Sequence, residues 1–461
     1  MSLDLIIKNA TVLLNENDSP SAKAKSKKNS DGKPNLIEVT THVGIKGGKI
    51  VQIGSENTPS AQMIDGKGLH LLPGIIDSQV HFREPGMMQK EDLQSGTLAA
   101  ALGGVTSVFE MPNTNPATTT AELFADKLRR AHGRAWVNYG FYIGGSAENV
   151  DQLAELEKAP GCSGIKVFMG SSTGSLLIDD EAILEAVFRK GSRRVILHSE
   201  DEKRLRERKH LALESKDVRT HPVWRDELTA LTSTQLAVRL SLETKRPIHV
   251  LHITTQEEMD FLRAQKRKTD LISVEVLPQH LTLAAPECYE RLGTLAQQNP
   301  PIREQRHQDA LWKAVLDGTV DVLGSDHAPH TLEEKKREYP NSPSGVPGVQ
   351  TLLPIMLNHV NQGKLSLARL VELVCENPRR VFGCTSKGRI ALGLDADLTL
   401  VDMNKTRTIE NKWIASRCGW TPFDGMKVKG WPICTIIAGH LIMQDDQILG
   451  TPRGQMVEFQ S

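Results

Sequence analysis

The feature that most constrains the fold of this chain is a regular alternation of short apolar runs with helix-length segments between residues 70 and 324. The runs have the length of buried strands, and the segments between them place apolar residues three and four apart, as amphipathic helices do. Eight strands that alternate with helices are what a (β/α)8 TIM barrel requires. A doubly wound open sheet is the structural alternative, but no Gly-x-Gly-x-x-Gly motif follows the first run. The eight predicted strands are 71–81, 105–111, 136–143, 164–169, 195–198, 248–253, 272–277 and 320–324.

The two ends of the chain have β character instead. Residues 3–14 alternate loosely, residues 42–54 carry a Gly47-Gly48 turn, and apolar runs return at 397–402 and 434–438. Because such strands have no partner in the barrel, we expect them to pair with each other as a small β-sandwich.

The predicted organisation has three parts: the N-terminal part of the β-sandwich at 1–68, a TIM-barrel catalytic domain at 69–385, and the C-terminal part of the sandwich at 386–461. Residues 15–34 are rich in Ser, Lys, Asn, Asp and Pro. This composition cannot bury a core, so a mobile loop is predicted there.

Composition narrows the class of function. Lys+Arg and Asp+Glu both number 56, and this zero formal charge does not favour nucleic acid or an acidic membrane as partner. The six cysteines are scattered without a Cys-x-x-Cys pair, as in a protein with reduced thiols. No targeting segment and no apolar run of about 20 residues is visible, so a cytoplasmic protein is expected.

Residues suited to chemistry lie at the ends of the predicted strands, where TIM barrels carry their active sites. Each has an ordinary structural explanation, since single histidines and lysines are usually packing or surface residues. Their coincidence at five strand ends predicts a metal-dependent hydrolase, because imidazole and carboxylate ligands suit Zn²⁺. The residues are His81 and Arg83 after the first strand, Lys166 in the fourth, His198 in the fifth, His252 in the sixth, and Asp326 and His330 after the eighth.

The set resembles the cyclic amidohydrolase superfamily and, within it, the dihydroorotases of the long (type I), complex-forming kind. The resemblance spans nearly the whole chain. Its most specific segments are His81-Phe82-Arg83-Glu84-Pro85-Gly86, Met111-Pro112-Asn113-Thr114, Asn299-Pro300-Pro301-Ile302-Arg303 and Asp326-His327-Ala328-Pro329-His330. Allantoinases and hydantoinases share the fold and metal set, but the first and third segments favour dihydroorotase.

The resemblance implies one or two Zn²⁺ ions and a role for each residue. His81 and Asp326 would bind one metal, a carboxylated Lys166 would bridge, and His198 and His252 would hold the other. Asp326 would also be the catalytic base and acid. The substrate would be bound by Arg83, Asn113, Asn299 and His330. The reaction implied is the reversible interconversion of L-dihydroorotate and N-carbamoyl-L-aspartate in pyrimidine biosynthesis, by a homo-oligomer (dimer or tetramer) that could partner aspartate carbamoyltransferase.

One position departs from the family pattern, which has histidine where this chain has Gln79. An amide oxygen can ligate zinc, but it is neutral and harder than imidazole, so a weaker first site is expected. Three alternatives follow: two metals with a weakened site, a single metal held by Lys166, His198 and His252, or a silent scaffold. The retained metal and substrate residues favour an active enzyme.

Overall fold

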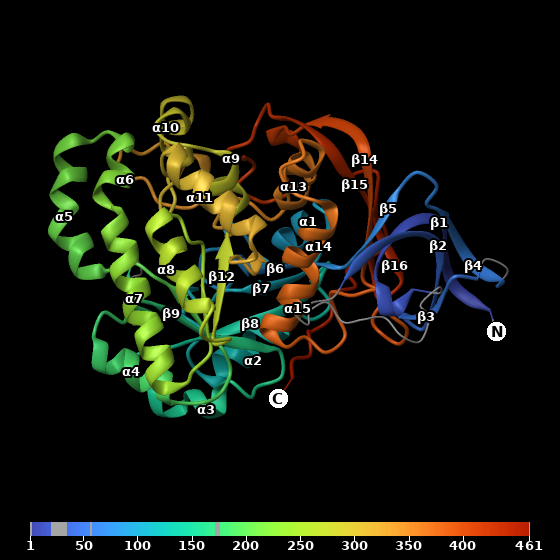
Figure 1. Cartoon of the computed structure of the whole chain (residues 1–461), viewed down its shortest axis with the longest axis horizontal. Coiled ribbons are helices and arrows are strands. Elements are labelled where there is room, and N and C mark those ends of the chain that lie inside the picture. Colours follow the sequence, from blue (N-terminus) through green and yellow to red (C-terminus); the bar gives the residue numbers. More distant parts are fainter. Residues whose placement is uncertain (1, 20–34, 56–57, 171–175, 461) are drawn as a thin grey trace.

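The computed structural model describes residues 2–19, 35–55, 58–170 and 176–460 of the 461-residue chain. A barrel wrapped in helices and a smaller sheet lie side by side, and both ends of the chain contribute to the smaller sheet (Figure 1). The predicted TIM barrel with a second β unit is therefore confirmed.

Eight parallel strands form the barrel, in sequence order around its wall. A parallel bridge from Val80 to His327 joins the first strand to the chain after the last one, and the N–H of His81 donates to the carbonyl of His327 at 2.7 Å. The strands are β6 (Ile75–Val80), β7 (Val105–Glu110), β8 (Asn138–Gly144), β9 (Cys162–Phe168), β10 (Val195–His198), β11 (Ile248–Val250), β12 (Ile272–Val276) and β13 (Val322–Leu323).

Helices follow the strands and cover the barrel from outside (Figure 1). Several begin at Asp or Thr N-caps, whose side chains accept hydrogen bonds from the first turn. They are α1 (Leu93–Leu102), α2 (Ala121–Ala131), α3 (Leu153–Leu156), α4 (Glu181–Arg189), α5 (Glu202–Ser215), α6 (His221–Trp224), α7 (Glu227–Thr244), α8 (Gln256–Lys266), α9 (Pro278–Thr282), α10 (Glu287–Leu292), α11 (Gln305–Leu316), α12 (Leu332–Lys335), α13 (Leu352–Asn361), α14 (Leu367–Val371) and α15 (Asn377–Phe382).

The smaller sheet has nine strands, and its two halves come from opposite ends of the chain. They meet where β5 pairs antiparallel with β14, so the expectation that the terminal strands pair with each other is confirmed. Apolar residues of both halves belong to one buried cluster. The strands are β1 (Leu3–Asn15), β2 (Leu36–Lys46), β3 (Lys49–Ile53), β4 (Ser60–Asp65), β5 (His70–Pro73), β14 (Leu398–Thr408), β15 (Lys427–Ile437), β16 (His440–Gln444) and β17 (Gln447–Ile448).

The first predicted barrel strand is divided in the structure. Residues up to Pro73 belong to the smaller sheet as β5, and the barrel strand β6 starts at Ile75. Gly74 lies between them in a confined space: a Cβ there would come within 2.5 Å of Thr106 Oγ1. The apolar run at 71–76 therefore serves two sheets in succession, which its hydrophobicity alone does not reveal.

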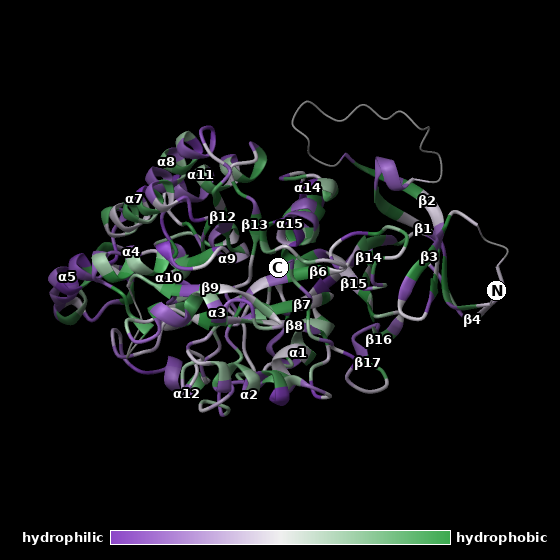
Figure 2. Ribbon diagram, turned by 90° about the horizontal axis from the view of Figure 1, so that it is seen from below, coloured by the Kyte–Doolittle hydropathy of each residue, from purple (hydrophilic) through white to green (hydrophobic). Residues whose placement is uncertain are grey.

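Hydropathy follows this architecture. Barrel and sheet strands are largely green in Figure 2, whereas the outer helix α5 is mostly purple. Only Leu205 and Ala212 of α5 are buried, so the basic stretch at 203–210 lies mostly on the surface. Of the predicted mobile loop at 15–34, only residues 15–19 are described, and Glu16–Asp18 form a 3-10 turn; the rest lies outside the described residues. No helix among the described residues is long and apolar enough to cross a membrane.

Candidate active site and metal centre

The predicted metal ligands lie at or near the carboxyl ends of barrel strands. Lys166 is in β9, His198 is the last residue of β10, and His252 follows β11 by two residues. Because the strands are parallel, these ends meet at one mouth of the barrel. The buried members of the predicted set are Gln79, His81, Arg83, Lys166, His198, His252, Asp326 and His330.

Asp326 is the centre of the first cluster. Gln79 Nε2 donates to Asp326 Oδ1 at 2.9 Å, and His81 Nε2 lies 3.2 Å from the same oxygen. Burial lowers the pKa of His81, which favours the neutral ring. His81 Nδ1 lies 2.7 Å from Asn113 Oδ1, an acceptor, so Nδ1 carries the proton. Lone pairs on His81 Nε2 and Asp326 Oδ1 then converge, which is an arrangement suited to a cation.

His198 and His252 form a second cluster with the same property. His198 Nε2 lies 2.7 Å from Glu200 Oε2, so it carries the ring proton and leaves a lone pair on Nδ1. That Nδ1 faces His252 Nε2 at 3.1 Å. Burial lowers the pKa of both histidines, and His198 adds to this effect on His252. Two neutral imidazoles thus direct nitrogen atoms at one point.

Lys166 is a buried amine near both clusters. Burial lowers its pKa to about 7, although the charges of Asp326 and Glu275 act in the opposite direction. Its Nζ donates to the carbonyl of Val167 at 3.3 Å and lies 4.1 Å from the centre of the Phe168 ring. A substantial fraction of this amine is therefore uncharged near neutral pH.

Two buried atoms of the predicted ligands have no hydrogen-bond partner among the described residues. They are Gln79 Oε1 and His252 Nδ1. An unsatisfied buried polar atom costs about 1–3 kcal/mol, and amide oxygen is a ligand that metals accept. Together with the converging lone pairs, the orphaned oxygen shows that the residues present fit a metal centre.

Two carboxyl groups that were not predicted lie behind these ligands. Burial raises the pKa of Asp77 to about 7 and that of Glu275 to about 8. Glu275 Oε2 accepts a hydrogen bond from Ser78 Oγ at 3.0 Å, and Asp77 Oδ1 accepts from the N–H groups of Gln79 and Ser325. They hold the chain on both sides of the Gln79–Asp326 contact.

The cationic side chains of Arg83 and Lys90 lie on either side of His330, and we call these three residues the cationic cluster. Lys90 Nζ is 3.1 Å from His330 Nδ1, and since an ammonium only donates, that nitrogen accepts. His330 Nε2 therefore carries the proton and donates to the carbonyl of Ser344 at 3.1 Å. Arg83 Nε donates to the carbonyl of Pro329 at 3.3 Å, and Arg83 Nη2 lies 3.3 Å from His330 Nε2. Burial lowers the pKa of Arg83 to about 10, which leaves it charged at neutral pH.

Asn299 has different surroundings from the other predicted residues. Its Oδ1 lies 3.0 Å from His221 Nε2, a ring nitrogen that is also 3.0 Å from the carbonyl of Gln298. Burial lowers the pKa of His221 to about 3, so this ring is neutral. The structure thus joins Asn299 to α6.

Backbone conformation also distinguishes the site. Arg83, His252 and Asp326 have φ values of 63°, 37° and 44°. Residues other than glycine rarely adopt this left-handed region, and such strain is concentrated at functional sites. Each of these side chains leaves its strand end in a direction that extended backbone would not give.

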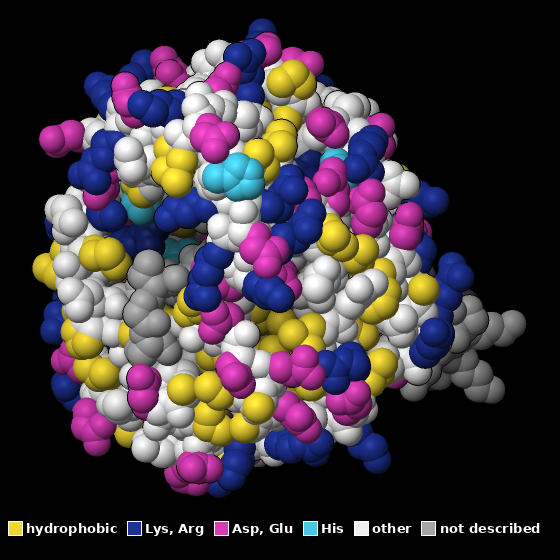
Figure 3. Space-filling view, turned by 90° about the vertical axis from the view of Figure 1, so that its left-hand side faces the viewer, with side chains coloured by type: hydrophobic (Ala, Val, Ile, Leu, Met, Phe, Trp, Pro, Cys, Tyr) yellow, Lys and Arg dark blue, Asp and Glu magenta, His cyan; other side chains and the backbone are white. Residues whose placement is uncertain are grey.

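The face of the molecule that Figure 3 shows is hollowed at one place. Histidine side chains lie in it, and Lys and Arg side chains border it (Figure 3). A hollow with both kinds of side chain is suited to a small anion.

Comparison with known proteins agrees with this geometry. A family model described as "Amidohydrolase family" matches residues 70–442. The chain belongs to the amidohydrolase family. Dihydroorotase of Methanosarcina acetivorans is 36% identical over 427 residues, covering 90% of this chain and 91% of the relative. Dihydroorotase of Pyrococcus furiosus is 32% identical over 419 residues, with 90% and 92% covered.

Solved structures of the family resemble the whole chain. L-hydantoinase (dihydropyrimidinase) from Arthrobacter aurescens has a TM-score of 0.90 at 27% identity and covers 99% of this chain and 100% of its own. A D-hydantoinase structure has a TM-score of 0.86 at 26% identity, with 99% of both chains covered. The predicted hydrolase of the amidohydrolase family is confirmed, and members of this family typically depend on a metal.

Sequence reasoning missed the residues that support the ligands. Glu200 stands two positions after His198, on the same side of an extended chain, and this spacing could have indicated it. Glu275 lies in β12 and is hidden in an apolar run. Lys90 and Arg225 reach the site from α-helical or loop segments, and nothing in the local sequence marks them.

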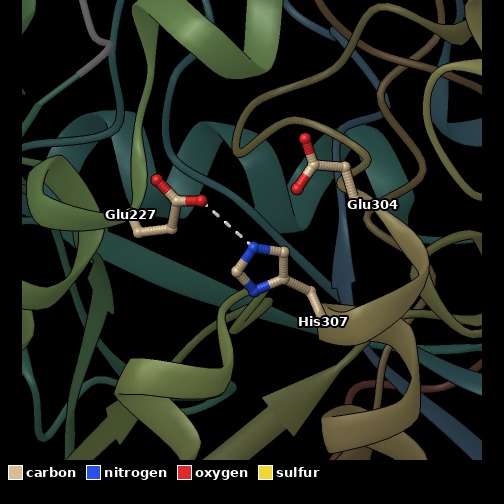
Figure 4. Close-up of side chains that lie close together, drawn as sticks. All are labelled: Glu227, Glu304 and His307. Carbon is tan, nitrogen blue, oxygen red and sulfur yellow. Dashed lines mark hydrogen bonds and ion pairs between the residues drawn. The ribbon is translucent and has the colours of Figure 1, made fainter.

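A second group of possible metal ligands lies at the N-terminal ends of α7 and α11, where Glu227, Glu304 and His307 approach one another (Figure 4). His307 Nδ1 accepts the N–H of Gln256 at 3.0 Å, so Nε2 carries the proton that bonds Glu227 Oε1 at 3.2 Å. Neither ring nitrogen has a free lone pair. Arg306 also pairs with Glu227 at 2.9 Å, so this group is an ion-pair network rather than a metal site.

Proposed function

We propose that this chain is a metal-dependent dihydroorotase, which interconverts L-dihydroorotate and N-carbamoyl-L-aspartate in pyrimidine biosynthesis. One observation carries the proposal. The buried guanidinium of Arg83, whose Nε donates to the carbonyl of Pro329 at 3.3 Å, lies two residues from His81 and beside His330 and Lys90. A carboxylate on the ring of the substrate needs such a cationic partner, whereas an unsubstituted hydantoin ring has no carboxylate. The dihydroorotase relatives support the same assignment.

The proposed ligands are those whose lone pairs converge. His81, Asp326 and the orphaned Gln79 Oε1 would hold one Zn²⁺, and His198, His252 and Lys166 would hold a cation in the neighbouring cluster. A zinc ion bound there would lower the pKa of water and polarise the ring carbonyl. Whether one or both positions are filled depends on how well a neutral amide replaces imidazole at position 79.

Lys166 is proposed to act as a carbamate. Its uncharged amine would attack carbon dioxide to form an N–C bond and would release one proton, which turns a potential cation into an anionic ligand. Only the neutral amine is nucleophilic, and burial of Lys166 supplies that form by lowering its pKa to about 7. The pKa thus supports the modification.

Asp326 is proposed to move the proton. Its carboxylate would take a proton from the attacking water and pass it to the ring nitrogen as the amide bond breaks, as base and then acid. Gln79 and His81 both contact Oδ1, so the position of this oxygen is set before substrate arrives. Arg83 would bind the substrate carboxylate with Asn113 and His330, and Asn299 would contact the ring.

The proposal extends to the cellular setting. All six cysteines are unpaired and buried, which suits a reducing cytoplasm. The resemblance to complex-forming dihydroorotases supports a homo-oligomer and a complex with aspartate carbamoyltransferase. Light scattering of the purified protein, alone and with that enzyme, tests both points.

Substrate choice tests the central assignment. We expect saturable hydrolysis of L-dihydroorotate and little hydrolysis of unsubstituted hydantoin or allantoin. Arg83→Met should lower kcat/KM for L-dihydroorotate by about 10–100-fold, because charged hydrogen bonds of about 1.5–3 kcal/mol are lost. It should leave any hydantoin turnover nearly unchanged. Preferred hydrolysis of hydantoin with no effect of Arg83→Met would assign the chain to the hydantoinases instead.

A further inference from the structure

The feature that carries a further inference is a buried ion pair directly behind His198. Glu200 Oε2 lies 2.7 Å from His198 Nε2, and Arg225 grips the same carboxylate at two points, from Nε to Oε1 at 3.0 Å and from Nη2 to Oε2 at 2.5 Å. The side chains of Arg225 and Glu200 are 4% and 0% exposed. Both carboxylate oxygens of Glu200 thus face nitrogen donors.

This arrangement leaves His198 one tautomer. Because the guanidinium of Arg225 donates to both oxygens of Glu200, the carboxylate accepts from His198, and Nε2 of His198 carries the ring proton. The lone pair is then on Nδ1, the atom that faces His252 Nε2 at 3.1 Å. Rotation of the imidazole ring about its side-chain bonds would break the contact with Glu200. The carboxylate therefore fixes both the tautomer and the orientation of the His198 ring.

Arg225 is itself held in place. It follows α6 directly, and its N–H donates to the carbonyl of His221 at 3.1 Å. Neighbouring Trp224 bonds α5 twice: its Nε1 donates to the carbonyl of Leu205 at 2.8 Å, and its own carbonyl accepts from Arg208 Nε at 3.2 Å. The guanidinium also lies 5.2 Å from the Trp224 ring. These contacts hold the C-terminal end of α6, and with it Arg225, in a fixed position beside Glu200.

The chain contains a second buried Arg–Glu pair for comparison. Arg246 Nη2 donates to Glu157 Oε2 at 2.6 Å, with side chains 2% and 3% exposed. Glu157 also accepts from the N–H groups of Ser192 and Arg193, which precede β10 at the opposite end of that strand from His198. This pair matches the first in burial and composition but contacts none of the proposed ligands.

We propose that Glu200 and Arg225 are positioning residues for metal binding: Arg225 orients the Glu200 carboxylate by its two-point contact, and Glu200 fixes the Nε2–H tautomer of His198 so that Nδ1 is presented as a ligand. The inference rests on the proposed function in one respect, that the site binds a divalent cation. A carboxylate partner on a ligating histidine raises its basicity, and loss of such a partner costs about 10–100-fold in metal affinity.

The test measures Zn²⁺ affinity of the full-length protein, stripped of metal and titrated against a chromophoric chelator. Glu200→Gln should weaken binding by about 10–100-fold, because an amide that donates to His198 favours the wrong tautomer. The single variant Arg225→Lys keeps a positive charge beside Glu200 and should retain part of the Zn²⁺ affinity. We expect a value between those of the wild type and Glu200→Gln. Glu157→Gln is the matched control. It should lower the thermal midpoint of the metal-free protein but keep Zn²⁺ affinity within about twofold.

The outcomes distinguish metal binding by the site from the positioning role of Glu200 and Arg225. No Zn²⁺ binding by the wild type would contradict the proposed function itself. Wild-type binding with an equal affinity in Glu200→Gln would overturn only the positioning role, as would an equal loss in Glu157→Gln. Should Glu200→Gln fail to fold, Arg225→Lys decides on the same scale, and unchanged affinity there overturns the inference.

Discussion

Gln79 is the residue at which this chain differs most from the pattern it otherwise resembles. Its Nε2 donates to Asp326 while its Oε1 is buried without a partner among the described residues. A neutral histidine at position 79 would offer one ring nitrogen with a lone pair for a metal. Gln79 instead has a donor, Nε2, and a separate acceptor, Oε1. The amide therefore combines a weaker, neutral proposed metal ligand, Oε1, with a hydrogen bond from Nε2 that orients the proposed catalytic carboxylate.

A substitution at this position tests that interpretation. Gln79→His should raise the zinc content of reconstituted protein towards one additional equivalent, because imidazole binds zinc better than a neutral amide. Elemental analysis of desalted protein gives the ratio. An unchanged ratio, with Gln79→Ala also at the wild-type value, would show that position 79 has no part in metal binding.

Glu275 provides a test that depends on pH. Its folded pKa, raised by burial to about 8, exceeds the ordinary value of 4.5. The protonated group therefore stabilises the metal-free protein below pH 4.5, and this contribution is lost as pH rises to about 8, by at most about 1.4 kcal/mol per pH unit. Relative to Glu275→Gln, wild-type stability should fall between pH 5.5 and 7.5 in urea unfolding. If the free energies of unfolding of the two proteins changed in parallel with pH, the raised pKa of Glu275 would be contradicted.

At the scale of elements, the segment after β13 shows how function depends on packing. Residues 331–348 are polar and directly follow Asp326 and His330 in the chain. In the structure Lys335 Nζ donates to the carbonyls of Gln297, Pro343 and Gly345 at 2.9–3.1 Å, and Trp420 Nε1 donates to the carbonyl of His330. These hydrogen bonds hold residues 331–348 in place at several points. The segment therefore helps to position His330 within the cationic cluster.

Removal of that fastening should affect substrate binding. Lys335→Met should lower the thermal midpoint and raise KM for L-dihydroorotate by more than it lowers kcat, since His330 loses its support while Asp326 does not. Steady-state kinetics separate the two parameters. The exposed neighbour provides the control, Lys336→Met, which should change neither. A fall in kcat alone would contradict this role.

Much of the barrel was predictable because strand ends in a TIM barrel collect chemistry in one place. Lys166, His198, His252 and Asp326 could be named from their position after apolar runs. The divided run around Gly74 could not, since both of its halves are equally apolar and only their partners differ. Arg225 and Lys90 were also missed, because contacts that join distant segments leave no periodic signal.

At the scale of the whole molecule, the chain's last residues return to the barrel. Val457 N donates to the carbonyl of Tyr139 at 2.9 Å, and the Phe459 ring lies 5.2 Å from that of Phe109. Figure 1 shows the C-terminus beside the barrel rather than the smaller sheet, although β14 to β17 belong to that sheet. The C-terminal segment thus connects the two parts after completing one of them.

The contact of Phe459 with the barrel predicts that truncation of this side chain lowers the stability of the protein. Phe459→Ala should destabilise the protein by about 2 kcal/mol, because a half-buried aromatic ring and its edge contact are lost. Denaturant unfolding measures the change, and the relative activity of folded protein should not alter. Stability equal to that of the wild type would show that the tail is dispensable.

The most direct test of the account is turnover of L-dihydroorotate by zinc-reconstituted protein beside an Asp326→Asn variant. We predict saturable hydrolysis by the wild type, its loss on chelation, and a fall of at least about 100-fold in kcat for the variant, as expected when an acid–base group is removed. Bound zinc with no hydrolysis above the Asp326→Asn value would contradict the assignment of this site as a dihydroorotase.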